Sequence, residues 1–293
     1  MDRKIIELYD RFTHGGMDRR GFLERLATLA GGTVAASALL PLLEYNYAAE
    51  AAIVPEADPR IAIQTVRFPG GAGEVVGYLA TPKAGGKRPA VIVIHENRGI
   101  NPHIQDIARR LAVEGYVALG VDYLSPFGGT PAPYDDDKAR DLFAKVTPDG
   151  ALPDSRGALA YLKSHAGTTG KVGAVGFCWG GGAVNNLAVA DPTLDAGVAF
   201  YGRQPAADRV GAIKAPLMLH YAGLDDRLNA GIPAYEAALK ANGKTYELFV
   251  YAGADHGFNN DTAGVRYDKA AADLAWGRTI AFFKRYLGAP GGA

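Results

Sequence analysis

The apolar positions between residues 90 and 287 alternate short continuous runs with longer segments of helical spacing. Residues 90–94 form a β-branched run, which is typical of a strand buried on both faces of a parallel sheet. Residues 102–114 then carry apolar side chains at the spacing of one helical face. The same alternation predicts further strands at 116–121, from 172 to a glycine-rich turn, at 196–201, 216–222 and 245–251, and further helices at 142–146, 152–163, 232–240 and 268–287.

Two alternating segments, residues 63–69 and 75–81, precede this region and are joined by residues 70–73, which are Gly-Gly-Ala-Gly. This pattern predicts a β-hairpin at an antiparallel edge. Strands that alternate with helices require right-handed crossover connections. The predicted fold class is therefore α/β: a mostly parallel central sheet with helices on both faces and an antiparallel N-terminal hairpin.

Composition narrows the possible partners. The chain has 293 residues, 48% of them hydrophobic, and 31 basic residues balance 31 acidic ones, so charge gives no reason to expect nucleic acid or an anionic membrane surface as a partner. One cysteine excludes an intrachain disulfide, and the six histidines show no zinc-binding spacing, so no metal or cofactor is predicted. Three aspartates at 135–137 are predicted to begin a helix rather than to bind a metal. A monomer or small homo-oligomer is expected.

The first 51 residues differ from the rest. Arg19 and Arg20 are followed by Phe22 and Leu23, then by an almost uncharged stretch at 26–43, and small residues at 48–51 offer a cleavage site. This resembles a twin-arginine export signal. It predicts a leader at 1–51, a single α/β domain at 52–293, a periplasmic location and only transient contact with the membrane. The alternatives are an uncleaved membrane anchor and an ordinary amphipathic helix.

A nucleophile elbow is predicted at residues 176–180, Gly-Phe-Cys-Trp-Gly. In such a strand-to-helix turn the residues two before and two after the nucleophile must be nearly without side chains, as Gly176 and Gly180 are. Cys178 would then lie at the top of the sheet beside the positive end of the next helix, where a thiolate is favoured. The alternative is a buried cysteine that acts as a small hydrophobic residue.

Two further strand ends carry the acid and the base that could activate this nucleophile. Asp225 and Asp226 follow one strand, and His256 follows the next. Ligands bind at the carboxyl ends of parallel strands, and nucleophile, acid, base is the chain order of the α/β-hydrolase triad. The sequence does not decide between the two aspartates. Asp225 could instead cap a helix, and His256 could instead make only a local hydrogen bond.

These motifs resemble the dienelactone hydrolase (carboxymethylenebutenolidase) family of the α/β-hydrolase superfamily, from about residue 75 to 286, and the resemblance implies the α/β-hydrolase fold for the domain at 52–293. The family has a G-x-C-x-G-G elbow and a Cys-Asp-His triad, which fall on Cys178, Asp225 and His256. The resemblance implies that Glu96 modulates a mostly neutral resting thiol. It also implies an oxyanion hole made by the backbone N–H groups of Trp179 and Asn97.

The chain departs from the family where two arginines hold the carboxylate of a dienelactone. Those places are filled by Ser125 or Pro126 and by Asn260. The dienelactone itself is therefore in doubt as a substrate. Candidates to line the substrate pocket are, from their positions at strand ends, Tyr123, Tyr201, Phe258, Trp179 and Arg98, with Arg203 and Arg266 from other loops.

The sequence thus predicts an exported hydrolase that cleaves a small-molecule ester or lactone through an acyl-thioester intermediate. The alternatives are a thioesterase or other acyl hydrolase with the same triad, and a non-catalytic binding protein with the same fold.

Overall fold

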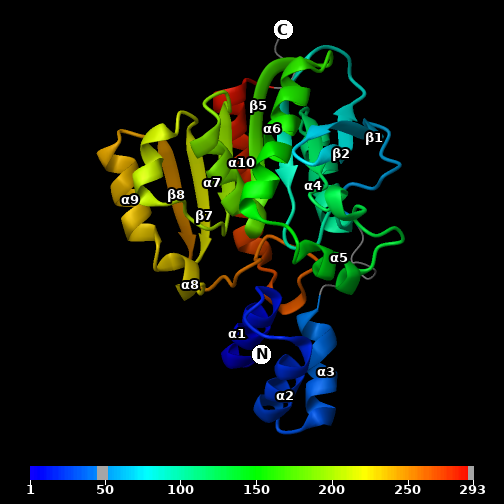
Figure 1. The fold of residues 1–293 in the computed structure, drawn as a ribbon, viewed down its shortest axis with the longest axis vertical. Helices are drawn as coiled ribbons and strands as arrows, with labels where there is room; N and C mark the ends of the chain where they lie inside the picture. Colours follow the sequence, from blue (N-terminus) through cyan, green and yellow to red (C-terminus); the bar gives the residue numbers. More distant parts are fainter. Residues whose placement is uncertain (45–51, 290–293) are drawn as a thin grey trace.

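The computed structural model describes residues 1–44 and 52–289. One eight-stranded sheet forms the centre, in the order β1-β2-β4-β3-β5-β6-β7-β8 (Figure 1). β2 pairs antiparallel with both β1 and β4, and all later neighbours are parallel. The strands are β1 (Ile61–Gly70), β2 (Gly73–Pro82), β3 (Arg88–Ile94), β4 (Val117–Val121), β5 (Thr168–Phe177), β6 (Ala196–Phe200), β7 (Leu217–Ala222) and β8 (Tyr246–Tyr251). The predicted fold class and edge hairpin are confirmed.

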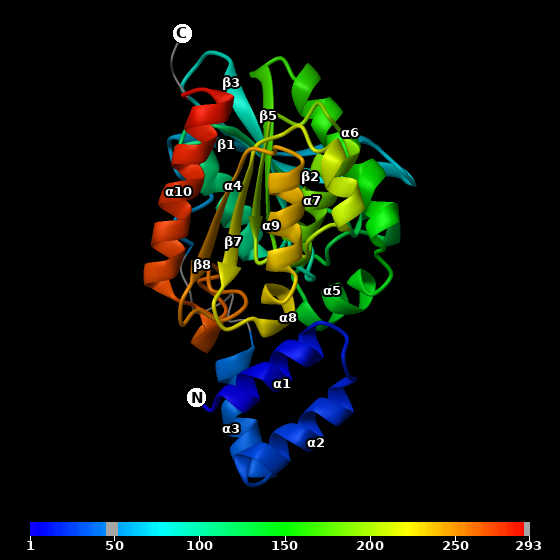
Figure 2. The ribbon, with the colours of Figure 1, turned by 90° about the vertical axis from the view of Figure 1, so that its left-hand side faces the viewer.

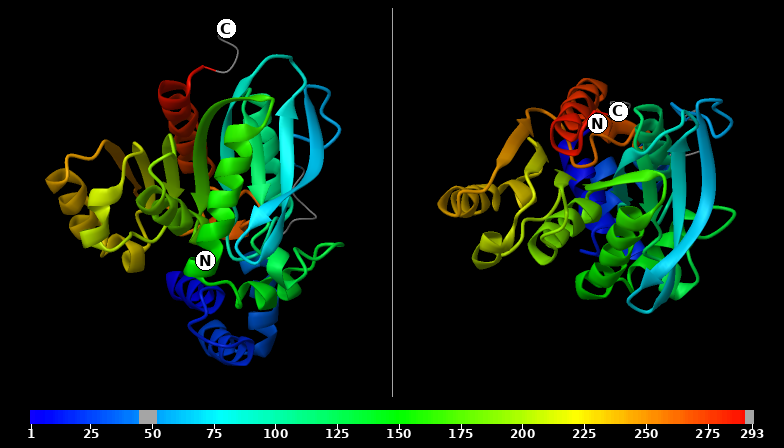
Figure 3. Two further views of the ribbon diagram at one scale, coloured as in Figure 1. Left: turned by 45° about the horizontal axis from the view of Figure 1, so that its top comes forward. Right: turned by 90° about the horizontal axis from the view of Figure 1, so that it is seen from above.

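Both faces of the sheet are covered at its centre, which explains why the central parallel strands are continuous apolar runs rather than alternating ones. Within β3, Val91 and Val93 belong to one buried cluster, whereas Ala90, Ile92 and Ile94 belong to the other. The first cluster includes buried residues of α4 (Pro102–Val113) and α10 (Lys269–Leu287), and the second includes those of α6 (Pro148–Ser164), α7 (Trp179–Ala190) and α9 (Ile232–Ala241). The view from above in Figure 3 shows these two helical layers on either side of the sheet.

The helices of the sheet region are α4 (Pro102–Val113), α5 (Asp136–Phe143), α6 (Pro148–Ser164), α7 (Trp179–Ala190), α8 (Asp226–Asn229), α9 (Ile232–Ala241) and α10 (Lys269–Leu287), with 3-10 turns at Ser125–Phe127, Ala207–Ala212 and Gly264–Arg266. The three aspartates do begin a helix, as predicted. Asp135 caps α5 by accepting from the N–H of Lys138, Asp136 pairs with Arg98, and Asp137 pairs with Arg19.

The N-terminal residues form three helices, α1 (Arg3–Thr13), α2 (Arg19–Ala30) and α3 (Thr33–Leu43). Their apolar side chains make a buried cluster of their own, separate from both sheet clusters: Ile5, Leu8, Tyr9, Phe12, Phe22, Leu26, Ala36 and Leu43. Figures 1 and 2 show the three helices together below the sheet, with α1 closer to it than α2. We refer to residues 1–44 as the N-terminal helical unit.

Part of the predicted export signal falls within this unit. Its uncharged stretch spans α2 and α3, and the small residues at 48–51 lie outside the described residues. Of the helices described, none is by itself long and apolar enough to cross a membrane. Taken together, α2 and α3 have the length and the apolar composition of a membrane span, but they are bent by 112° at their junction.

Candidate active site

Cys178 lies at the sharp turn between β5 and α7. Its backbone has φ 55° and ψ −115°, a conformation that residues with a side chain rarely adopt. A Cβ on Gly176 would lie 2.1 Å from the carbonyl oxygen of Gly180, and one on Gly180 would lie 2.3 Å from that of Ile94. Only glycine fits at these two positions. The turn therefore has the geometry expected of a nucleophile elbow, and it leaves Cys178 at the carboxyl end of β5.

His256 and Asp225 meet beside the elbow. Nδ1 of His256 lies 2.6 Å from Oδ2 of Asp225, and both side chains are buried. The other carboxylate oxygen of Asp225 accepts from the N–H of Leu228 at 3.2 Å, so the residue also caps α8. Asp226 is exposed in the first turn of α8. The aspartate that holds the imidazole is thus Asp225, and the predicted capping role is an additional contact rather than an alternative.

A residue that the sequence reasoning did not single out also reaches the sulfur. Nε2 of His14, the residue that follows α1, lies 3.2 Å from Sγ of Cys178. The ring of His14 contacts that of His256 edge-on, with centroids 4.8 Å apart. One ring nitrogen of each histidine and the sulfur lie within 4.8 Å of one another, the one such group of possible metal ligands in the described ranges. The hydrogen bond from His14 accounts for this arrangement without an ion.

The two imidazoles change the acidity of the thiol. Burial raises the pKa of Cys178, but the positive charges of His14 and His256 and the hydrogen bond between His14 and the sulfur outweigh this effect and lower the pKa to about 6. Burial lowers the pKa of both histidines, and the negative sulfur reverses this, so the pKa of His14 is raised and that of His256 is raised well above its ordinary value. The balance favours a thiolate paired with an imidazolium at neutral pH.

Glu96 lies in the loop after β3, as expected, but it contacts a different residue from the one that the resemblance implies. It is 2% exposed, and its Oε2 accepts from the side-chain amide of Asn260 at 2.9 Å. Among the described residues, it makes no hydrogen bond to the thiol. The carboxylate that was expected to modulate Cys178 is therefore engaged by the residue that replaces one of the family's arginines.

The two backbone groups expected to form an oxyanion hole flank the sulfur. Trp179 is the first residue of α7, where N–H groups have no partner within the helix. Within the described part of the chain, no group accepts from the N–H of Trp179 or of Asn97. The side-chain amide of Asn97 donates to the carbonyl oxygen of Thr13 at 2.5 Å. Both backbone donors are thus available for a ligand.

The expected pocket residues fall into two groups. Tyr201 lies against His256, with ring centroids 4.9 Å apart, and Phe258 packs on Tyr201 at 5.4 Å. Tyr123 packs on the other side of the elbow against Trp179 at 5.1 Å, and its hydroxyl bonds to Ser155 at 2.7 Å. These rings are buried walls around the nucleophile and its base.

Two of the three candidate arginines contact protein groups, and the third lines a cavity. Arg98 is 1% exposed and pairs with Asp136 at 2.8 Å. Arg266 lies over the ring of Tyr9 at 5.0 Å. Arg203 lines a small cavity of about 130 Å³ next to Trp179. Ser125, at one of the positions of the family's carboxylate-binding arginines, accepts from the N–H of Val76 at 2.9 Å. Because Ser125 and Asn260 are both uncharged, neither of them offers a positive charge to a substrate carboxylate.

A cleft of about 310 Å³ leads to His256 between α1 and the loops that follow β7 and β8. Its walls carry charges of both signs: Arg3, Glu7, Asp10 and Arg11 from α1, and Asp225, Asp226, Arg227, Asp255 and Arg266 from the loops. The route to the base is therefore polar, whereas the rings around the sulfur are apolar.

A mostly parallel sheet with a cysteine elbow after β5, an acid after β7 and a histidine after β8 defines the chain as an α/β-hydrolase. The sequence model of the dienelactone hydrolase family matches residues 75–287. The chain therefore belongs to the dienelactone hydrolase family, whose members are hydrolases. Residues 1–32 match a separate family model, described as YqhI-like.

Individual relatives agree with this membership. The chain is 34% identical to a protein of Saccharolobus solfataricus named "Putative carboxymethylenebutenolidase", over 72% of this chain and 94% of that one. It is 31% identical to a protein of the same name from Methylorubrum extorquens, over 88% and 94%. The crystal structure titled "Putative Dienelactone Hydrolase" from Klebsiella pneumoniae superposes with a TM-score of 0.70 at 31% identity, over 77% of this chain and 99% of that one.

Proposed function

We propose that this protein hydrolyses a small carboxylic ester or lactone through an acyl-thioester on Cys178. The observation that carries the proposal is the convergence of Cys178, His256 and Asp225 from three strand ends. Nδ1 of His256 is held by Asp225 at 2.6 Å, and its Nε2 is buried with no hydrogen-bond partner in the described ranges. A buried nitrogen in this state is available to exchange a proton with the sulfur or the substrate.

The reaction follows from these positions. The thiolate of Cys178 attacks the carbonyl carbon, a C–S bond forms, and the carbonyl electron pair moves to oxygen. The tetrahedral intermediate collapses, the C–O bond breaks, and the leaving oxygen takes a proton from the imidazolium of His256. Water then attacks the thioester as His256 accepts its proton, and the acid and the thiolate are released. Asp225 stabilises the imidazolium and fixes its orientation throughout.

The oxyanion would accept hydrogen bonds from the backbone N–H groups of Trp179 and Asn97. Both are fixed before substrate arrives, since one begins α7 and the other belongs to the buried loop after β3. Each such donor contributes about 3 to 4 kcal/mol to transition-state stabilisation in comparable sites.

The substrate class that we propose follows from the residues at the two positions where the family has carboxylate-binding arginines. Asn260 bonds to Glu96, and Ser125 bonds to the backbone of Val76, so neither provides the cation that would hold a substrate carboxylate. We therefore propose esters or lactones that carry no carboxylate at those two positions, and the aromatic rings of Tyr201 and Phe258 beside the base favour an apolar acyl or aryl group.

Hydrolysis of p-nitrophenyl acetate tests the proposal. The untreated protein should release p-nitrophenol with an initial burst, and iodoacetamide treatment or Cys178→Ala should abolish both the burst and turnover. Intact-mass analysis of the quenched reaction should show an added acetyl group on the wild type alone. Equal slow rates in all three samples would instead support a non-catalytic binding protein, and a normal rate in Cys178→Ala would reject the assigned nucleophile.

A further inference from the structure

His14 enters the site from a part of the chain that the hydrolase family model does not include. That model begins at residue 75, whereas His14 follows α1 and reaches Cys178 across 164 residues of sequence. The contact therefore comes from outside the segment that the family model matches, and it places a second imidazole on the nucleophile.

The ring of His14 is oriented by its own helix. Nδ1 lies 2.7 Å from the carbonyl oxygen of Asp10 and 3.4 Å from the carboxylate of the same residue. A carbonyl oxygen can only accept, so Nδ1 carries a proton and donates. This directs Nε2 toward the sulfur, where it accepts from a thiol when neutral and donates to a thiolate when protonated.

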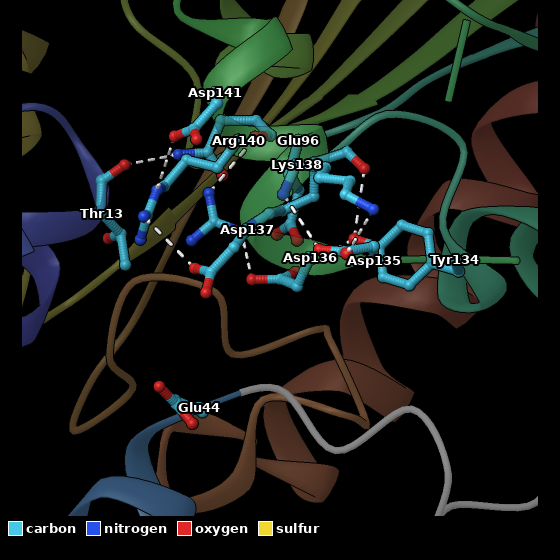
Figure 4. Close-up of polar contacts among 12 residues, drawn as sticks. Thr13, Glu44, Glu96, Tyr134, Asp135, Asp136, Asp137, Lys138, Arg140 and Asp141 are labelled. Atoms are coloured by element: carbon cyan, nitrogen blue, oxygen red, sulfur yellow. Dashed lines mark hydrogen bonds and ion pairs between the residues drawn. The ribbon is translucent and has the colours of Figure 1, made fainter. Parts of the chain in front are cut away.

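Several contacts hold α1 in this position. The amide of Asn97 donates to the carbonyl oxygen of Thr13 at 2.5 Å, next to His14, and Arg3 donates to the carbonyl oxygen of Leu224 at 2.6 Å. Arg140 lies over the ring of Phe12 at 4.8 Å. Figure 4 shows Thr13 near the charged residues of α5. Because these contacts come from two loops and from α5, the position of His14 does not depend on any one of them.

Among the described residues, His14 is the charged group that the structure shows in a side-chain hydrogen bond with the sulfur. His256 faces the sulfur from the loop after β8, and Asp225 lies behind it. Asp10 lies behind His14 on α1, and Arg227 is 3.8 Å from both carboxylates. Glu96, which was expected to contact the thiol, is bonded to Asn260.

We infer that His14 is a further catalytic residue, which the N-terminal helical unit places on Cys178 to hold the resting nucleophile as a thiolate. This rests on the proposed role of Cys178. The proton of the thiol moves to an imidazole, so the pair is neutral overall and requires no other reagent. When the sulfur attacks the substrate, its electron pair passes to the carbonyl carbon and the hydrogen bond from His14 is lost, because a thioester sulfur is a weak acceptor. The acyl group then occupies the space next to His14.

The rate of alkylation by iodoacetamide as a function of pH tests this without any substrate. The thiolate is the reactive form, so the midpoint of the profile reports the acidity of the thiol. The wild type should give a midpoint near 6. His14→Gln keeps an amide donor but cannot carry a charge, and its midpoint should rise by about one pH unit or more, since a nearby opposite charge shifts a pKa by that amount.

A matched control removes an imidazole elsewhere. His165 follows α6 at the opposite end of β5 from the elbow, so His165→Gln should retain the wild-type midpoint. An unchanged midpoint in His14→Gln, or alkylation that is faster at every pH, would overturn the inference, because His14 would then only cover the site.

A second variant distinguishes loss of the imidazole from misfolding of the protein. His14→Ala should show the raised midpoint, and added free imidazole should restore rapid alkylation near neutral pH, whereas a merely structural role would give no rescue. The outcome is also separable from the proposed function. Loss of ester hydrolysis with a shifted midpoint leaves the His14 contact valid, and normal hydrolysis with an unshifted midpoint rejects only the inference about His14.

Discussion

The side-chain amide of Asn260 donates a hydrogen bond of 2.9 Å to Glu96, and both residues are buried beside the nucleophile elbow. The resemblance to the family implied that Glu96 would act on the thiol. In this chain Glu96 is instead hydrogen-bonded to Asn260, and His14 is the residue that contacts the sulfur.

The first prediction follows from this pair. Glu96→Gln and Asn260→Ala should each leave the alkylation midpoint of Cys178 within about 0.3 pH units of the wild type, because no hydrogen bond links the carboxylate to the sulfur. The double variant should lose no more stability than the more harmful single variant, since residues in direct contact are not additive. Thermal melting and the alkylation profile measure both. A midpoint that moves in Glu96→Gln alone would restore the role that the resemblance implied.

The second prediction separates two neighbouring aspartates. Asp225→Asn keeps the cap of α8 but removes the charge that holds His256, so kcat/KM for p-nitrophenyl acetate should fall by about 10³- to 10⁴-fold, as in other triads. Asp226 is exposed and lies outside the contact, so Asp226→Asn should stay within about threefold of the wild type, as is usual for surface changes. Equal losses in the two variants would contradict the assignment of Asp225.

The third prediction concerns the dependence of activity on pH. The pKa of Cys178 is lowered to about 6, so the thiolate predominates above that pH and is lost below it. On the acid side, kcat/KM should therefore fall about tenfold for each pH unit below 6 if one proton controls the reaction. The pKa of His256 is raised well above its ordinary value, so the imidazolium that protonates the leaving group persists at neutral pH. A steady rise in rate from pH 6 to 9 would instead indicate a neutral resting thiol.

The fourth prediction concerns the first 51 residues. Export with cleavage near residue 51, as the sequence predicts, would remove His14 and the whole N-terminal helical unit. The inference about His14 requires that the active protein retain it. Mass spectrometry of protein from separated cell fractions decides between these expectations: we expect active material to include residues 1–44, either free or anchored by an uncleaved signal. Full activity in material that starts near residue 52 would support cleavage and exclude a role for His14.

The sequence revealed most of the fold and of the site. The central strands could be predicted because burial on both faces makes them continuous apolar runs, and the elbow could be predicted because its two glycines lie where a Cβ would meet backbone atoms. The choice between Asp225 and Asp226 could not be made, because adjacent residues differ only in which way each points at the start of α8.

His14 was not predicted because nothing in the sequence connects it to a cysteine 164 residues away. A signal for its helix was present: Ile5, Leu8, Tyr9 and Phe12 repeat at the spacing of one helical face, and all four are buried in the N-terminal cluster. The hydrogen bond between Asn260 and Glu96 was missed for the same reason, since both side chains are short and their loops meet only in the folded protein.

The backbone angles of Cys178 have a consequence for how this protein can change. A φ of 55° at a residue with a side chain costs folding free energy, on the order of 1 to 3 kcal/mol, which the surrounding structure must supply. Substitutions that relax the elbow would therefore make the molecule more heat-resistant while misdirecting the sulfur. Selection for thermal stability alone would therefore favour substitutions at the elbow that reduce catalytic activity. Natural variation in substrate preference is expected to accumulate in the loops instead.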